Sequence, residues 1–197
     1  MNSISNSSHI ERFSRFELAV ISQRNDHGEE LIRTLQKTRA RVQHIWPMPD
    51  EIPVEYDVVF CELVDDLPRR IKGQPGNSLV AIVVVIPANT EMNHKLLENC
   101  TPHSIVHLPC TPQAVLNNLS LARSNFLYER RLRQRIEKLD ENLRSMKTIE
   151  QAKVIMMQRD SISEEEAYRQ LRLKAMHRRV TIGKLASAIV DTQDILG

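Results

Sequence analysis

The side chains in this sequence that are best suited to a chemical task are cations near its C-terminal end. Residues 167–190 include no Asp or Glu, yet they contain Arg169, Arg172, Lys174, Arg178, Arg179 and Lys184. Lys and Arg bind phosphate oxygens, so a run of them without neighbouring carboxylates predicts a polyanion as the partner. A solvated helix face would have the same composition, so the elements that position these cations have to be considered next.

Charge is divided unevenly along the 197 residues, although the net charge is only +2. Residues 1–122 contain 11 Lys and Arg against 14 Asp and Glu, a balance of −3. Residues 123–197 contain 16 against 11, a balance of +5. The C-terminal part is therefore the part expected to meet nucleic acid.

No residue pattern in the chain predicts catalysis. The seven histidines form no HExxH motif and have no evident triad partners, and there is no Gly-rich phosphate loop. The three cysteines, Cys61, Cys100 and Cys110, are odd in number and lack metal-ligand spacing. We expect no catalytic residue, no metal, no cofactor and no disulfide framework, with each thiol acting as a small buried apolar group.

The chain has no pattern typical of a membrane or secreted protein. Its longest apolar run, residues 79–87, is far shorter than the ~20 residues that cross a bilayer. The first nine residues are polar and lack the basic and apolar regions of a signal peptide. We expect a cytoplasmic protein without a membrane partner.

The N-terminal part has an alternating strand and helix pattern. Apolar, β-branched runs occur at residues 18–21, 42–46, 56–63, 79–86 and 104–108. Residues 29–40 fit a first helix, and another begins at Ala114. This order predicts the α/β class, with a doubly wound parallel sheet of five strands.

That order resembles the receiver domain of response regulators, a flavodoxin-like fold, over residues 14–122, after a flexible segment 1–13. Receivers bind magnesium through an acidic pair after the first strand, where this chain has Ser22 and Gln23. Glu62 stands at the phosphoacceptor aspartate, and Leu108 at the lysine that precedes a proline. The resemblance implies a pseudo-receiver that is not controlled by phosphorylation. Glu62 is interpreted as a polar strand end, with a built-in phosphate mimic as the alternative.

A coiled-coil linker is predicted over residues 123–147. Apolar residues are spaced alternately four and three apart there, over about two heptads, at Leu132, Ile136, Leu139, Leu143 and Met146. Charged residues fill the other faces of this helix, so we expect it to form a homodimer. The alternative is an amphipathic helix that packs within its own subunit.

Three helical segments follow from the remaining pattern, and they predict a small three-helix bundle. The linker helix continues to about Asp160, and Ser163 with Glu166 forms the capping-box signature of a second helix. A third helix after Thr181 has apolar residues at helical spacing. On the second helix, Ala167, Leu171, Ala175 and Tyr168 are predicted on the core side, and Tyr168 and Met176 are expected in core or rim packing, with base contact as the alternative.

The runs IEQAKVIMMQR at 149–159 and SEEEAYRQLRLKAM at 163–176, followed by Ile182 and Ala186, resemble the ANTAR module, here placed at residues 148–197. Val154 stands where that family usually has Gly. Members of the family are transcription antiterminators that bind stem-loops in nascent leader mRNA. The order of pseudo-receiver, coiled coil and ANTAR module resembles the antiterminators of aliphatic-amidase operons, which implies control by a ligand-sensing repressor protein of the amide-sensor type.

The cations expected to contact RNA lie in and beside this module, and they are Lys153, Arg159, Arg169, Arg172, Lys174, Arg178, Arg179 and Lys184. Lys153 and Arg172 are implied by the family motif and are expected opposite the apolar faces. For both, an ion pair within the module is the alternative role. The alternative functions are a DNA-binding response regulator with a degenerate receiver and a protein-binding coiled-coil adaptor.

Overall fold

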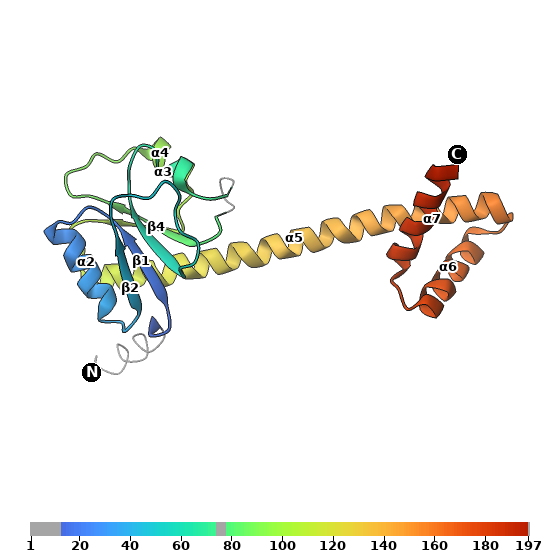
Figure 1. The fold of residues 1–197 in the computed structure, drawn as a ribbon, viewed down its shortest axis with the longest axis horizontal. Helices are drawn as coiled ribbons and strands as arrows, with labels where there is room; N and C mark the ends of the chain where they lie inside the picture. The colour runs from blue at the N-terminus through green and yellow to red at the C-terminus, as the bar shows by residue number, and fades with distance from the viewer. Residues whose placement is uncertain (1–12, 74–77, 197) are drawn as a thin grey trace. The chain divides into compact units, whose positions relative to one another are not determined.

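The computed structural model describes residues 13–73 and 78–196, and the chain divides into two compact units, residues 1–130 and 131–197 (Figure 1). Most of the segment predicted as a flexible N-terminus lies outside the described residues. Phe13, at the end of that segment, is buried in the core of the first unit with 2% of its surface exposed.

The first unit contains a five-stranded parallel sheet with the order β2-β1-β3-β4-β5. The predicted fold class is confirmed, and β3, β4 and β5 are shorter than the apolar runs that predicted them. Their bounds are β1 (Glu17–Ile21), β2 (Arg41–Ile45), β3 (Val58–Glu62), β4 (Ala81–Ile86) and β5 (Ser104–His107). All six residues of β4 are buried. Because both faces of a parallel sheet are covered by helices, such a strand is apolar along its whole length, and this explains the continuous β-branched run in the sequence.

Helices cover both faces of this sheet. On one face, α2 (Asp26–Gln36) and the beginning of α5 (Pro112–Asp160) pack against a core that includes Leu18, Val20 and Phe60. On the other face, α3 (Leu67–Arg70) and α4 (His94–Cys100) pack against a core that includes Ala19 and Ile21. Successive residues of a strand point to opposite faces, so each strand supplies both cores.

The boundaries of α2 differ from those predicted because the sequence analysis missed its cap. The Asn25 side chain accepts a hydrogen bond from the backbone N–H of Gly28 at 2.8 Å, so the helix begins at Asp26 and not at Glu29. It ends at Gln36, before Arg39, whose φ of 62° is left-handed and incompatible with continuing the helix.

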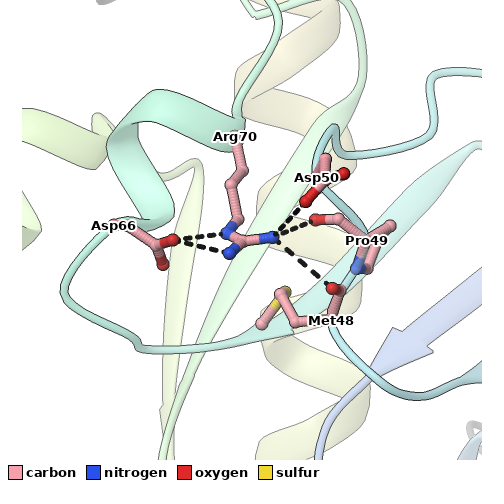
Figure 2. A network of polar contacts seen from close by, with 5 residues as sticks. All are labelled: Met48, Pro49, Asp50, Asp66 and Arg70. Carbon is pink, nitrogen blue, oxygen red and sulfur yellow. Dashed lines mark hydrogen bonds and ion pairs between the residues drawn. The ribbon is translucent and has the colours of Figure 1, made fainter.

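Arg70 fixes the loop that follows β2 (Figure 2). Its guanidinium donates two hydrogen bonds to one carboxylate oxygen of Asp66, at 2.9 and 2.6 Å, and one to the carbonyl of Pro49 at 2.7 Å. Asp50 lies 3.5 Å from the same group. The hydrogen bonds from Arg70 hold the pKa of Asp66 below its ordinary value. No pattern in the sequence singled out this contact.

In the second unit, the last part of α5 packs with α6 (Glu164–Arg178) and α7 (Ile182–Leu196), which confirms the predicted helical bundle. Ser163 caps α6 as predicted, accepting a hydrogen bond from the Glu166 N–H at 3.3 Å. The buried core is Ala152, Met156, Ala167, Leu171, Ala175, Leu185 and Ala186. Four of these seven are alanines, so the helices approach closely.

Gly183 marks the closest approach between α7 and α5. A Cβ atom on Gly183 would collide with the Ser145 hydroxyl and lie 3.4 Å from the Ser145 Cβ. A side chain at position 183 would therefore force the Ser145 hydroxyl to move, and a branched one would crowd the two helices; no sequence pattern indicated this contact.

Candidate nucleic-acid interface

Helix α6 separates a buried side from an exposed side. Ala167, Leu171 and Ala175 recur every four residues and are 0 to 2% exposed. Residues on the opposite side, such as Arg169, Arg172 and Met176, are exposed. The three-helix core therefore fixes the direction in which the basic side chains of α6 point.

Four of the predicted cations are exposed, and the structure gives none of them an ion pair among the described residues. They are Arg172, Arg178, Arg179 and Lys184. Lys174 is also exposed and lies close enough to Asp160 to contribute, after Arg159, to the lowered pKa of that carboxyl. These five side chains carry positive charge that the protein itself does not neutralise at close range.

Arg159 and Arg169 are exposed but paired. Arg159 donates two hydrogen bonds to the neighbouring Asp160, at 2.7 and 2.8 Å. Arg169 holds Glu166 in the same two-pronged way, at 2.8 and 2.9 Å. Hydrogen bonds from Gln170 and then from Arg169 lower the pKa of Glu166. A phosphate would have to compete with these carboxylates, so both arginines are weaker candidates.

Lys153 does not lie opposite the core, and that part of the prediction is wrong. Only 8% of its surface is exposed. Its ammonium lies 2.7 Å from a Glu150 carboxylate oxygen and 2.6 Å from a Glu164 oxygen, and these hydrogen bonds raise the lysine pKa. This is the ion pair within the module that the sequence analysis kept as the alternative. It joins α5 to the first turn of α6.

Arg179 ends α6 in a conformation that usually belongs to glycine. Its φ of 55° and ψ of 37° are left-handed, its N–H bonds the Met176 carbonyl at 3.1 Å, and the Val180 N–H bonds the Ala175 carbonyl at 3.1 Å. This is a Schellman motif, in which Gly is the common residue because it lacks a Cβ. An arginine there costs stability and places a cation beside the other exposed ones.

The outer face of α6 also exposes large apolar side chains, which the sequence analysis placed wrongly or missed. Tyr168 was predicted on the core side but is 44% exposed, and Met176 is 65% exposed. Leu173 and Val180, which were not singled out, are 50% and 41% exposed. A helix advances about 100° per residue, so Tyr168 turns away from the core position of Ala167.

The predicted seam on α5 is exposed throughout. Its five residues have exposed fractions between 42% and 63%, at Leu132, Ile136, Leu139, Leu143 and Met146. The seam therefore has no apolar cover within the described residues of its own subunit. None of the helices that the structure describes, α5 included, contains an apolar stretch that could span a bilayer.

At the carboxyl end of the sheet, the receiver-like position is closed by the chain itself. The Glu62 carboxylate accepts a hydrogen bond from the backbone N–H of Gln23 at 2.8 Å. Ser22 is 2% exposed, and its hydroxyl has no hydrogen-bond partner among the described residues. The described residues include no group of three metal-ligating side chains.

The three thiols are free cysteines, and burial raises the pKa of each. Burial raises the pKa of Cys61 well above its ordinary value and that of Cys100 to about 11. Cys110, which is partly exposed, also has a raised pKa, mainly through burial and then through the charge of Glu30. A thiol held in its protonated form is a poor nucleophile and a poor metal ligand.

Comparison with known proteins agrees with both units. Residues 16–123 match the family model described as AmiR, N-terminal, and residues 137–190 match the ANTAR domain. The chain is 28% identical to the aliphatic amidase regulator of Pseudomonas aeruginosa over 184 residues, which cover 90% of this chain and 92% of that protein.

Among solved structures, the response regulator StyR is similar over 89% of this chain and 98% of its own, with a TM-score of 0.52. At 12% identity this likeness shows the fold alone. The AmiR N-terminal model covers more than half of the chain, from the residue before β1 to the first part of α5. The chain therefore belongs to the AmiR family, with an AmiR N-terminal domain followed by an ANTAR domain.

Proposed function

We propose that this chain is a transcription antiterminator that binds stem-loops in a nascent leader mRNA through the exposed cations of its ANTAR domain. The observation that carries this proposal is the acid-free run 167–190, whose cations Arg172, Arg178, Arg179 and Lys184 are exposed and have no ion pair among the described residues. Unpaired cations attract phosphates without first breaking a contact of their own.

RNA fits this surface better than duplex DNA does. The ANTAR domain has one described aromatic side chain, Tyr168, so a stacking platform of the RNA-recognition-motif type is not available and contact would rest on the cations. Stem-loops offer closely spaced phosphates and unstacked bases that protein side chains can reach. Prevention of a terminator hairpin is the action that the family likeness supports.

The protein acts as a homodimer through the α5 seam. Five exposed apolar residues at alternating spacing form the a and d positions of a coiled coil. In a parallel pair, Arg135 at a g position would face Asp140 at an e position of the second copy, so the flanking charges are complementary. Two ANTAR domains would then be available for two stem-loops.

Control passes through a protein partner and not through phosphorylation. Ser22, Gln23 and Glu62 stand where a receiver needs magnesium ligands and a phosphoacceptor, and Glu62 is occupied by the Gln23 N–H. The family likeness supports a ligand-sensing repressor of the amide-sensor type. Incubation with acetyl phosphate and magnesium is expected to leave RNA affinity unchanged.

The experiment that tests RNA binding is a titration of the full chain against the two-hairpin leader RNA of its own operon, with matching duplex DNA as competitor, at two salt concentrations. We expect RNA to win and affinity to fall as salt rises. If DNA wins, the chain is a DNA-binding response regulator. Weak binding to both would favour the protein-binding adaptor.

Arg172→Gln is the informative variant in this titration. It should weaken binding and reduce the slope of log affinity against log salt by about 0.7 to 0.9, the value for one lost phosphate contact. The matched control is Arg24→Gln, which removes an exposed cation from the first unit. An equal loss for both variants would mean that net charge, and not this surface, binds the RNA.

Dimerisation is tested by sedimentation of Leu139→Asp. Burial of a leucine contributes about 1.5 to 3 kcal/mol, so loss of two leucines per dimer should dissociate it at micromolar concentration. Lys138→Asp, at an exposed position beside the seam, is the control and should leave the dimer intact. An unchanged mass for Leu139→Asp would exclude the seam as the interface.

A further inference from the structure

The outer face of α6 contains two apolar side chains that neither the core nor phosphate binding explains. Leu173 and Met176 are 50% and 65% exposed. They are three residues apart on one helix, so their side chains are neighbours. Both are therefore available to a partner while Leu171 and Ala175 hold the helix in the core.

Arginines surround this pair. Arg169 lies four residues before Leu173, and Arg172 lies four residues before Met176, so the four side chains form one continuous patch on the helix surface. Arg169 is paired with Glu166, whereas Arg172 has no ion pair among the described residues. We call these four residues the α6 patch.

The charges around the α6 patch select its occupant. Three acidic side chains, Glu164, Glu165 and Glu166, lie in the first turn of α6, Arg169 neutralises Glu166, and Asp160 lies close to Lys174. His177 and Arg178 follow Met176, and no acidic residue occurs from 167 to 190. A second copy of this basic surface would be repelled, whereas a polyanion would be attracted. The partner must therefore combine negative charge with an apolar surface.

An unstacked nucleotide has both properties, because its phosphate is anionic and its base presents a flat apolar face. We propose that Leu173 and Met176 pack against the face of an unstacked loop base of the RNA and so favour loops whose exposed base packs most strongly. Arg172 anchors the adjacent phosphate or lies flat on the base. This inference rests on the proposed RNA binding, and it assigns part of the loop preference to apolar side chains and most of the affinity to cations.

The test is the double variant Leu173→Gln/Met176→Gln in the full chain. Gln has a helix propensity close to that of Leu and Met, so α6 should persist, and circular dichroism checks this. Dissociation constants are measured for the two-hairpin leader RNA and for the same RNA with its loop bases changed. We expect the variant to bind the natural loop on the order of tenfold more weakly and the changed loop with a smaller loss, because the apolar contacts to the exposed base are removed.

Two further variants keep the result interpretable. Val154→Gln changes an apolar residue of the same domain that is 51% exposed but lies outside the α6 patch, and it should retain full loop preference. Met176→Leu keeps the apolar character and should also retain it. The salt dependence of the double variant should equal that of the unchanged protein, because no cation is lost.

The outcomes separate the two proposals. If the unchanged protein binds RNA with loop preference and the double variant keeps that preference, the α6 patch is not the base site. If the double variant loses dimerisation and keeps loop preference, the patch contacts a second copy, which also overturns the inference. If the unchanged protein binds no RNA, the proposed function itself fails.

Discussion

Polar side chains are paired or buried at the carboxyl edge of the sheet, whereas they are exposed on the outer face of α6. At the sheet edge, where receivers hold their chemistry, Glu62 is bound by the Gln23 backbone, and Ser22 is buried. On α6, Arg172 is exposed and unpaired among the described residues, and large apolar side chains face outward. In this molecule the receiver-like position at the sheet edge is closed by internal contacts, whereas cations and apolar side chains on the outer face of α6 are accessible to a partner.

Left-handed residues other than glycine occur in both units, for example Arg39 in the first and Arg179 in the second. Polar side chains also cap helices in both units, Asn25 in the first and Ser163 in the second. Arg179 differs because this strained residue is also one of the exposed cations of the candidate interface. Substitutions can separate the features that serve folding from those that serve binding.

The largest effect is expected from Gly183→Val, which tests whether the ANTAR domain depends on close helix approach. Its side chain would overlap Ser145, so the domain should lose about 1 to 3 kcal/mol of stability, the usual cost of overpacking. Hydrogen exchange of core amides such as that of Ala186 measures the loss. Ser145→Gly should restore part of it, and Ala188→Val, at an exposed site on α7, should cost little. Equal losses at positions 183 and 188 would contradict the contact.

Arg179→Gly is expected to raise stability and lower binding together. Gly removes the Cβ strain at φ 55°, which should stabilise the domain by about 0.5 to 1 kcal/mol. RNA affinity should fall, because a phosphate-binding cation is lost. Urea unfolding and RNA titration of the same protein measure both effects. A variant that gains stability without losing affinity would remove Arg179 from the interface.

Lys153→Met tests whether a motif cation acts in folding. The Glu164 pKa is lowered by Lys153, so this pair stabilises the fold above the ordinary carboxyl pKa of 4.5, and its contribution is lost as pH falls through the lowered value. The Lys153 pKa is raised, so its contribution is complete below 10.5 and is lost as pH rises through the raised value. Thermal unfolding from pH 3 to 11 should show both losses, and the variant should flatten them.

The control for Lys153→Met is Arg172→Gln, which should leave the pH profile unchanged while weakening RNA binding. If Lys153→Met instead preserves the pH profile of stability and abolishes RNA binding, Lys153 belongs to the interface, and its ion pairs with Glu150 and Glu164 are not its main role.

The smallest effect is expected at the sheet edge. Glu62→Gln keeps an acceptor for the Gln23 N–H but removes its charge, so the first unit should lose only about 0.5 kcal/mol. Equilibrium unfolding measures this loss, with Glu98→Gln on the exposed side of α4 as the control. Altered RNA binding by Glu62→Gln would support the phosphate-mimic alternative and would weaken the contrast between the two regions.

Continuous β-branched runs predicted the sheet, and apolar residues at helical spacing predicted the long helix and the bundle, because burial leaves a trace in residue order. The cap at Ser163 was predicted from two residues for the same local reason. The Asn25 cap has the same kind of signal and was missed, because the apolar pattern of that helix begins later.

The site was less predictable, because it depends on what other helices cover. By residue type alone, Lys153 and Arg172 are equivalent cations, yet Lys153 is buried and Arg172 is exposed. Glu150 gave a local signal, since it lies three residues before Lys153, but Glu164 belongs to the next helix. Leu173 was not singled out, and Met176 was expected in core or rim packing with base contact as the alternative, because their exposure depends on which α6 residues form the core.

The ion pair of Lys153 with Glu150 and Glu164 also affects how related chains are to be interpreted. In this chain the lysine and its two acidic partners join α5 to α6, so the same three residues in a relative would predict the helical assembly and say nothing of its transcript. A relative that kept the lysine and both acids but lost the α6 patch would have the same architecture and a different partner. A match to the family signature therefore indicates common ancestry and not a shared target. Differences in target are expected on the exposed side of α6.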